Sequence, residues 1–363
     1  MRTELPALLR LARTENVGPV TWRRLMAHTG SAETALEAVP EFARRGGRKT
    51  SLRVPSLAET EGEIAAVEAL GGRILTLRDP EYPPLLAEIP DSPPVISVLG
   101  NVSLLAQDGV AIVGARNASA AGMRIAESLA TGLADAELVV VSGLARGIDG
   151  AAHRGALFCG RTAAAIAGGL DVVYPPDHAA LQAEIAEKGV LVTEAPFGTQ
   201  PQARHFPRRN RLIAGLSLGC VVIEAAVRSG SLITADLADR YSRMVFAVPG
   251  SPLDPRNTGS NGLLKKGSVL TETTEDILSF LPRRSRNTGF SEPVAAWNDS
   301  WSFPDHVRDT VLPLLSFTPV AVDDLARRCH FSVSVVLCVL TELELAGRAY
   351  ILPGGRAVRA PDP

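Results

Sequence analysis

One short segment of the chain combines positive charge, an amide and an aromatic ring. Residues 203–217 read ARHFPRRNRLIAGLS, and the residues that could bind a ligand here are Arg204, Phe206, Arg208, Arg209, Asn210 and Arg211. Guanidinium groups pair with backbone phosphates, an amide can hydrogen-bond a sugar, a phosphate or a base edge, and an aromatic ring offers a face to an unpaired base. Stacking of this kind is worth about 1–3 kcal/mol per base. The mixture favours single-stranded nucleic acid over a duplex.

The ordinary alternative is that each arginine is a solvated surface charge and that Phe206 is a core residue beneath Pro207. Composition supports part of this alternative, because 37 residues are Lys or Arg. Only four of them are lysines, namely Lys49, Lys188, Lys265 and Lys266. Arginine is therefore common throughout the chain, and only local clustering counts as a signal. With 39 acidic residues the formal net charge is -2, so any polyanion site must be a local patch.

Three turns rich in small residues add to this segment. Each follows an apolar run and precedes a helical pattern: IVGARNASAAG at 112–122, SGLARGIDGAAH at 142–153 and RSGSLITADLA at 228–238. Glycine lets the backbone approach a ligand closely, and the free N–H groups of a helix N-terminus attract an anion. Three such turns suit a string of phosphates better than one small anion. The residues expected to contact this ligand are Gly114, Arg116, Ser119, Ser142, Gly143, Arg146, Gly147, Gly230, Ser231 and Thr234.

The turns match no nucleotide-cofactor motif. The G-x-G-x-x-G spacing and the Walker A sequence are absent, and the second strand ends at Ser142 and Gly143 where an acidic ribose-binding residue would be expected.

Asp149 and His153 could form an acid–base pair or half of a metal site. No further ligand accompanies them, so a structural hydrogen bond or partial burial is the simpler interpretation. The four cysteines also lack zinc spacing, and we expect neither a cofactor nor a metal.

The elements that must position these turns alternate between strand and helix. Six short apolar runs, most of them rich in β-branched residues, are predicted strands at 110–114, 137–143, 162–169, 189–195, 220–226 and 243–250. Strands buried on both faces and joined by helical crossovers predict an α/β fold with a Rossmann-like, doubly wound, mostly parallel sheet. Its ligand is expected beyond the carboxyl ends of the strands. The segment at 203–217 lies between the fourth and fifth strands and therefore at the same edge.

Other modules are predicted on both sides of this core. Residues 1–80 predict a helical module that resembles a SAM or helix-hairpin-helix domain, in which the turn from Asn16 to Pro19 either offers N–H groups to a phosphate or simply joins two packed helices. Residues 81–282 form the predicted Rossmann-like domain, and 283–304 form a polar linker. Residues 305–363 read as three helices and a hairpin, which is the outline of a winged-helix module.

The longest helix of the winged module is acidic. It reads SVSVVLCVLTELELAG at 332–347, with Glu342 and Glu344 and no Lys or Arg. Acidic side chains repel phosphates, so we expect this helix to contact protein or to support a dimer. Arg348, Arg356 and Arg359 on the wing leave a weak contact with DNA open.

The pattern of apolar residues predicts a soluble protein with no membrane contact. Each apolar run is interrupted well before the roughly 18 residues that a membrane span needs. The N-terminal residues alternate charge with leucine and lack the apolar block of a secretory signal. The widely spaced cysteines suit a reducing compartment, and a cytoplasmic location is expected.

Six ordered motifs resemble those of the DprA/Smf DNA-processing proteins of natural transformation: IVGARNAS, VSGLARGIDGAAHRGAL, GGLDVVYPPDH, HFPRRNRLIAGLS, VIEAAVRSGSLITADLA and VFAVPGSPLDPRNTGSNGLLKKGS. The resemblance covers about residues 80–282. It implies a Rossmann-like core that binds single-stranded DNA, forms homodimers, loads the recombinase RecA onto incoming strands and has no known catalytic activity. By motif, it implies that Arg116 binds phosphate, that Phe206 stacks on a base and that the Gly230–Ser231 turn contacts a phosphate.

The chain departs from some relatives at two positions. Those relatives carry Lys where Pro176 and Ala203 stand here, which puts the first contact in doubt, and Arg204 could substitute for the second. The resemblance also implies a dimer contact late in the core, where the leucines could equally be ordinary buried residues. The corresponding residues are Asn261, Leu263 and Leu264.

The rival class is an enzyme, a nucleotide phosphoribohydrolase of the lysine-decarboxylase-like Rossmann group, which also binds phosphoribosyl units at glycine-rich strand ends. That group carries a P-G-G-x-G-T-x-x-E signature, and the turn at 228–238 has neither its spacing nor its Glu. Glu194 and Glu224 remain near the strand ends, where a structural role is the simpler interpretation. We therefore predict a binding protein rather than an enzyme.

Overall fold

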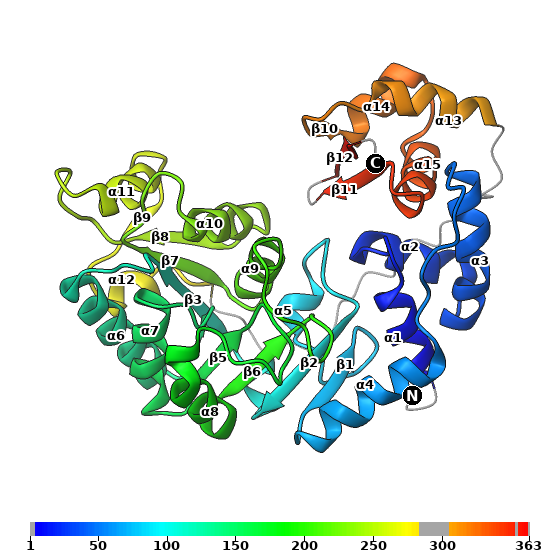
Figure 1. Ribbon diagram of the computed structural model, residues 1–363. Helices are drawn as coiled ribbons and strands as arrows, with labels where there is room; N and C mark the ends of the chain where they lie inside the picture. The colour runs from blue at the N-terminus through cyan, green and yellow to red at the C-terminus, as the bar shows by residue number, and fades with distance from the viewer. Residues whose placement is uncertain (1–3, 283–304, 353–354, 362–363) are drawn as a thin grey trace. The chain divides into compact units, whose positions relative to one another are not determined.

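The computed structural model describes residues 4–282, 305–352 and 355–361, and the chain forms two units (Figure 1). One unit comprises Glu63–Asn287, and the other combines Met1–Gly62 with Thr288–Pro363. The two ends of the chain thus belong to one unit. The predicted linker at 283–304 lies outside the described residues. No helix in the described part of the chain is long and apolar enough to span a lipid bilayer.

The larger unit is built on a sheet with strand order β1-β2-β6-β5-β4-β3-β7-β8-β9 among the described residues. The pairs from β6 through β9 are parallel, whereas β2 runs antiparallel to β6 and to β1. The prediction of a Rossmann-like, doubly wound, mostly parallel sheet is confirmed. The strands are β1 (Arg73–Thr76), β2 (Val95–Gly100), β3 (Gly109–Gly114), β4 (Val139–Ser142), β5 (Thr162–Ala165), β6 (Val190–Thr193), β7 (Gly219–Ile223), β8 (Met244–Ala247) and β9 (Val269–Leu270).

Helices cover both faces of this sheet (Figure 1). In β3, Val110 and Ile112 face one apolar cluster, and Ala111 and Val113 face the other. Burial on both faces explains why the central strands read as continuous apolar runs. The first face is covered by α4 (Leu57–Ala69), α6 (Ala120–Asp135), α7 (Ile148–Leu157), α8 (Ala179–Lys188) and α12 (Thr274–Leu278), and the second by α5 (Pro84–Ala87), α9 (His205–Gly215) and α10 (Gly230–Arg240).

The chain leaves the adjacent strands β3 and β7 in opposite directions. β3 continues through α6 to β4, and β7 continues through α10 to β8 on the other side. The loops after these strands therefore diverge at the carboxyl edge, where doubly wound sheets bind their ligands. Gly114 pairs with Ile223 here, and a Cβ on Gly114 would overlap the Ile223 carbonyl oxygen. Only glycine permits this approach of the two strands.

The second unit contains the predicted winged-helix module and the first 62 residues of the predicted helical module, whereas residues 63–80, with β1, belong to the unit of the large sheet. Three helices from the N-terminal part of the chain meet three helices and a small sheet of order β10-β12-β11 from the C-terminal part. These elements are α1 (Leu5–Arg13), α2 (Pro19–Thr29), α3 (Ala32–Arg45), α13 (Asp305–Val311), β10 (Val320–Ala321), α14 (Val322–Cys329), α15 (Val333–Leu345), β11 (Ala349–Leu352) and β12 (Arg356–Arg359).

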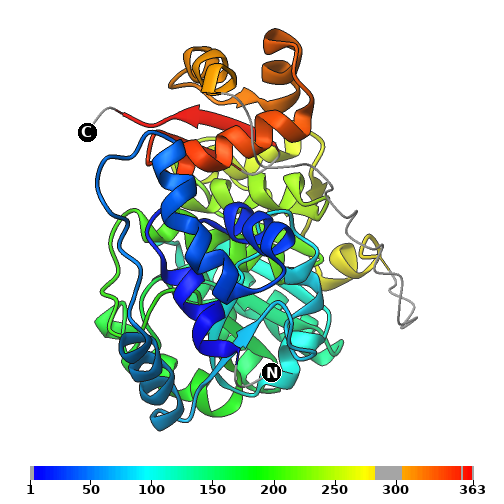
Figure 2. The same ribbon diagram turned by 90° about the vertical axis from the view of Figure 1, so that its right-hand side faces the viewer.

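Helix α15 packs against the N-terminal helices, which lie beside the orange and red C-terminal elements in Figure 2. Arg24 of α2 donates to the Leu337 carbonyl oxygen (2.8 Å) and to Thr341 Oγ1 (2.9 Å). A Cβ on Gly46, which follows α3, would overlap the Glu342 carbonyl oxygen. This acidic helix therefore packs against the N-terminal helices of its own chain, and its expected contact with another protein or a dimer stays a prediction.

The Glu344 side chain lies at the N-terminal end of α2. The Thr21 hydroxyl donates to the buried Glu344 carboxylate, whose oxygens lie 3.8 and 3.9 Å from the position of a Cβ on Gly18. Asn16 reaches the same helix through a 3.3 Å bond from its side-chain amide to the Leu345 carbonyl oxygen. Because a carboxylate already occupies this helix end, the structure favours the interpretation of the turn as a packing joint.

Candidate nucleic-acid interface

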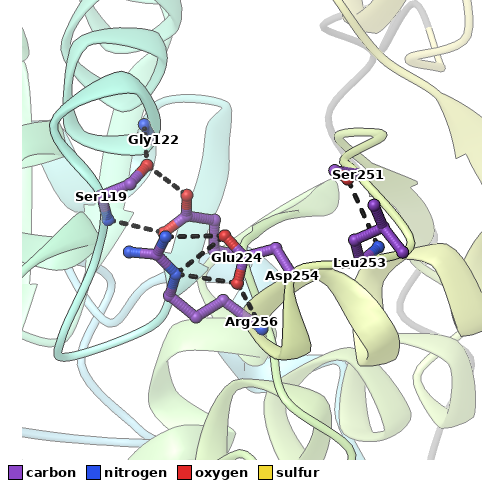
Figure 3. A network of polar contacts seen from close by, with 7 residues as sticks. All are labelled: Ser119, Gly122, Glu224, Ser251, Leu253, Asp254 and Arg256. Atoms are coloured by element: carbon purple, nitrogen blue, oxygen red, sulfur yellow. Dashed lines mark hydrogen bonds and ion pairs between the residues drawn. The ribbon is translucent and has the colours of Figure 1, made fainter.

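The N-terminus of α6 is occupied by a carboxylate of the protein itself (Figure 3). Ser119 donates its backbone N–H to Glu224 Oε2 (2.8 Å) and its hydroxyl to Glu224 Oε1, and the Gly122 N–H donates to Ser119 Oγ (2.9 Å). Glu224 follows β7, is buried and has a φ of 49°. Its charge stands where a phosphate would bind at a helix N-terminus. Ser119 was predicted to contact the ligand, but in this structure its N–H and hydroxyl are bonded to Glu224.

The loop after β4 is held from inside by α7. The Asp149 carboxylate accepts the N–H groups of Gly143 (3.2 Å) and Ala145 (3.4 Å), and Ser142 donates its hydroxyl to a carbonyl oxygen of β3 (2.6 Å). Burial raises the pKa of Asp149, while the charge of Arg209 and the two N–H groups act in the opposite direction. Ser142 and Gly143 are buried, so they shape the loop from within.

His153 on the same helix is also a structural group. Its Nε2 accepts the Leu144 N–H (3.2 Å), and its Nδ1 lies 2.7 Å from the Thr162 hydroxyl, which itself donates to the Val140 carbonyl oxygen. This pattern requires a neutral ring with its proton on Nδ1. Burial lowers the pKa of His153 to about 3. The structure thus favours the structural interpretation of Asp149 and His153, and the described residues hold no group of three or more His, Cys, Asp or Glu suited to a metal.

Gly147 joins the loops after β3 and β4. Its φ is 75°, a Cβ there would overlap the Ala115 carbonyl oxygen, and the following N–H of Ile148 donates to that same oxygen (3.2 Å). Arg116 and Arg146 extend from the joined loops into solvent. Arg146 pairs with Asp177 at 2.6 Å, and both side chains are exposed. An exposed ion pair contributes little free energy, so Asp177 holds Arg146 only weakly.

Helix α9 directs three of the predicted ligand residues inward. Arg209 is buried and donates to the carbonyl oxygens of Gly143 and Ala165, the latter at 2.8 Å. Asn210 is buried and donates to the Gly230 carbonyl oxygen (3.2 Å). Both side chains therefore bind backbone rather than face solvent, and Arg209 connects α9 to the ends of β4 and β5. Burial lowers the pKa of Arg209 to about 10, so the group stays charged at neutral pH.

Arg211 is likewise held within the protein. It pairs with the Glu194 carboxylate and donates to the Asp91 carbonyl oxygen (3.0 Å). The charges of Glu194 and Asp91 raise the pKa of Arg211 against the opposing effect of burial, which is the largest single contribution. The direct phosphate contact predicted for Arg211 is replaced here by this pairing, and Glu194 has the structural role expected for it.

The remaining residues of the segment gather around an aromatic ring. The Arg116 guanidinium carbon lies 5.0 Å from the Phe206 ring centroid, and that of Arg209 lies 5.9 Å away. The Tyr174 ring centroid is 5.7 Å from that of Phe206, with the planes tilted by 58°. Phe206 is half-buried, while Arg204 and Arg208 are exposed. The segments at 112–122 and 203–217 therefore meet at the predicted edge.

The third turn contributes mainly backbone. Gly230 is exposed at the start of α10, and its carbonyl oxygen accepts the Asn210 amide. Ser231 and Thr234 are buried, and the Ser231 N–H and hydroxyl contact the Ser229 hydroxyl at 3.3 and 2.6 Å. The turn thus lies beside α9 as predicted, but the side chains of Ser231 and Thr234 face the protein.

We call the exposed residues at this edge, together with half-buried Phe206, the arginine–aromatic edge. It comprises Arg116, Arg146, Tyr174, Arg204, Phe206 and Arg208. Tyr174 is the member that sequence reasoning missed. A tyrosine in a proline-containing loop directly after the GGLD motif was the available signal. Pro176 and Ala203, where some relatives carry Lys, are both exposed, so these positions add no charge to the edge.

The predicted dimer residues lie on α11 (Thr258–Lys265). Asn261 bonds the Gly250 backbone through both ends of its amide, at 3.2 and 2.8 Å. Leu263 packs partly against the apolar core, and Leu264 is half-buried. Asn261 and Leu263 therefore have roles within one chain, and a dimer contact through this helix stays a prediction.

The fold and this edge define a Rossmann-like protein with flanking helical and winged-helix modules, in which arginine and aromatic side chains gather at the carboxyl end of a parallel sheet. Family models match each part of the chain. Residues 73–282 match DNA recombination-mediator protein A, residues 3–66 match a DprA-like N-terminal HHH domain, and residues 302–355 match a DprA winged helix domain. The chain belongs to the DprA family of DNA recombination-mediator proteins.

Named relatives support this assignment. Protein Smf of Escherichia coli (strain K12) is 39% identical over 286 residues, which is 76% of this chain and 74% of that protein. The structure of DprA from Streptococcus pneumoniae matches with a TM-score of 0.60 and 41% identity, over 63% of this chain and 80% of that one. A structure of the Helicobacter pylori protein, described for its single-stranded DNA binding mode, matches with a TM-score of 0.52 and 30% identity, over 57% and 94%.

Proposed function

We propose that this protein binds single-stranded DNA through the arginine–aromatic edge. The observation that carries the proposal is the placement of the Arg116 guanidinium 5.0 Å from the ring centroid of Phe206, because a cation and a stacking face then meet one nucleotide at its phosphate and its base. Exposed Arg204 and Arg208 supply charge for neighbouring phosphates. The single-stranded DNA binding mode described for the H. pylori relative supports the same ligand.

Binding is proposed to need a structural layer beneath the edge. Arg209 bonds the backbone of the Gly143 loop, and Asn210 bonds the backbone of the Gly230 turn. These two contacts fix α9 against the loops after β4 and β7. Pre-organised loops lose little conformational entropy on binding, so Arg209 and Asn210 assist by positioning rather than by touching DNA.

The experiment is a titration of fluorescent oligo-dT and of a duplex of equal length at one salt concentration. Wild-type protein should prefer the single strand. Arg116→Ala should weaken that binding about tenfold or more, since a charge-assisted contact is lost. Arg73→Ala is the matched control, because Arg73 is an exposed arginine on the edge strand β1, paired with Glu81. Equal affinity for both DNA forms, or equal effects of the two substitutions, would contradict the proposal.

The protein is further proposed to act by binding alone. Glu194 pairs with Arg211, and Glu224 accepts from Ser119, so the two carboxylates considered for a phosphoribohydrolase already have partners. These pairings support binding over hydrolysis. Incubation with nucleoside monophosphates should release no free base, and release above the background of a heat-denatured sample would favour the enzyme.

The finer form of the proposal places the chain in the cytoplasm as a homodimer that protects incoming strands and loads RecA onto them during natural transformation. The family motifs support this form. Leu264 on α11 is the proposed dimer contact, and Leu264→Asp should lower the mass measured by light scattering from dimer to monomer. A RecA strand-exchange assay on DNA coated with single-strand binding protein tests loading, which should depend on this chain.

A further inference from the structure

Tyr174 is an exposed aromatic residue in the motif GGLDVVYPPDH, and no role is predicted for it from the sequence. Tyr174 is 43% exposed, yet its ring contacts that of Phe206, with 5.7 Å between the ring centroids. Phe206 is the more buried of the two rings. Tyr174 therefore continues the aromatic surface of Phe206 outward into solvent.

The loop that carries Tyr174 is fixed on both sides. Before it, the Val172 carbonyl oxygen accepts the Gln182 amide (3.1 Å). After it, the His178 N–H donates to the Pro175 carbonyl oxygen (2.9 Å), and His178 Nδ1 donates to the Leu144 carbonyl oxygen (3.0 Å). The ring is thus presented on an ordered backbone, which reduces the entropy lost when a ligand binds.

The charges around Tyr174 suit a nucleic-acid strand. Arg146 pairs with Asp177, three residues after Tyr174, and Arg116 lies over the adjoining ring. A single exposed aromatic residue needs no explanation on a protein surface. Two touching rings among exposed arginines are different, because proteins that bind single strands alternate stacking faces for bases with cations for phosphates.

We propose that Tyr174 is a second base-contact residue, so that Phe206 and Tyr174 bind two neighbouring unpaired bases. The inference rests on the proposed function, since it concerns the same strand at the same edge. The two rings already touch at a tilt of 58°, so no base enters between them and each ring receives a base on its remaining exposed surface. Tyr174 contributes its ring rather than its hydroxyl.

The test compares Tyr174→Ala, Tyr174→Phe and a matched control in binding of fluorescent oligo-dT. Tyr350→Ala is the control, because Tyr350 is 48% exposed on β11 in the other unit. Tyr174→Ala should bind about five- to a hundredfold more weakly with an unchanged salt dependence, as expected for the loss of one stacked base. Tyr174→Phe should bind like wild type, and so should Tyr350→Ala.

A photocrosslinking measurement on unmodified protein keeps the inference independent of the stability of the variants. An oligo-dT with 5-iodouracil substitutions should crosslink to Tyr174, identified by mass spectrometry. The inference is overturned if Phe206→Ala weakens binding while Tyr174→Ala does not, or if every crosslink falls outside the 172–178 loop. By contrast, failure of the wild-type protein to bind oligo-dT would overturn the proposed function itself.

Discussion

Two buried carboxylates, Glu224 and Glu344, occupy the N-terminal ends of α6 and α2. A helix N-terminus carries unpaired N–H groups and a partial positive charge, which an anion neutralises. In this chain the anion is a side chain at both places. A phosphate at either helix end would meet this carboxylate, so the proposed DNA contact relies on the exposed guanidinium groups of the arginine–aromatic edge.

Replacing Glu224 tests this role at the residue scale. Glu224→Gln keeps the shape of the side chain but removes its charge and one acceptor oxygen, so Ser119 loses a charge-assisted bond. We expect the free energy of unfolding to fall by about 1–3 kcal/mol, measured by urea denaturation. The matched control is Asp236→Asn in an exposed ion pair with Arg240, which should leave stability unchanged. Equal stability of both variants would contradict the assigned role.

Because His153 is buried, we expect the free energy of unfolding to depend on pH. Its pKa is lowered to about 3 by burial, whereas a histidine in the unfolded chain titrates near 6.5. The unfolded state therefore binds the proton more tightly, and the stabilisation is complete above the unfolded value and decreases as pH falls from 6.5 toward 3. Between pH 7.5 and 5.5 the wild-type protein should lose roughly 1 kcal/mol more than His153→Gln. Parallel pH profiles of the two proteins would exclude this.

The inward arginines show what sequence reasoning could and could not predict about the site. The clustering of Arg116, Arg208 and Phe206 followed from motif spacing and from the shared carboxyl edge. The burial of Arg209 was also readable, because Leu212 and Ile213, three and four residues later, share its helix face and are core residues. Its acceptors were not predictable, since the carbonyl oxygens of Gly143 and Ala165 are far away in sequence.

At the scale of elements, α15 accounts for the acidic character of the winged module. Glu342 bonds Arg308 (2.7 Å), and Glu344 bonds Thr21 and the Ile351 N–H, the latter at 3.0 Å. Both carboxylates are buried against protein donors. A helix that reads a DNA groove must present its side chains to solvent, and these two are committed to packing within the second unit.

Substitution of Gly46 tests how tightly α3 packs against α15. A Cβ at this position would overlap the Glu342 carbonyl oxygen, so Gly46→Ala should separate α3 from α15 and cost about 1–3 kcal/mol. Hydrogen exchange should become faster in peptides from both helices. Gly62→Ala is the matched control, because Gly62 lies in α4 and an added Cβ there would meet no atom within 4 Å. Unchanged exchange in α3 and α15 of Gly46→Ala would show that the contact is loose.

The six central strands were predictable because a parallel strand buried on both faces is a continuous apolar run. β1, β2 and β9 were not predicted. β9 has only two residues, and β1 lies at the other edge of the sheet and begins with an exposed residue. β2 follows a proline-rich stretch and pairs antiparallel, so neither its flanks nor its connection matched the repeating pattern of strand and helix. Short edge strands depend on pairing partners more than on their own sequence.

At the scale of the whole molecule, positive and negative charges nearly balance. The formal net charge is -2, and many exposed arginines pair with nearby carboxylates, as Arg327 does with Asp324 and Arg44 with Glu41. Such a surface provides no general attraction for DNA. The affinity for DNA should therefore depend on the few phosphates that contact the arginine–aromatic edge. The number of these phosphates can be obtained from the salt dependence of the affinity.

The salt dependence of oligo-dT binding is the most direct test of the proposed interface. The logarithm of the association constant should fall linearly with the logarithm of salt concentration, with a slope of about -0.7 for each phosphate contacted. Arg116→Ala should make the slope shallower by about 0.7, whereas Phe206→Ala should lower affinity at every salt concentration and leave the slope unchanged. Identical slopes for wild type, Arg116→Ala and Phe206→Ala would contradict the assignment of phosphate to Arg116 and of base to Phe206.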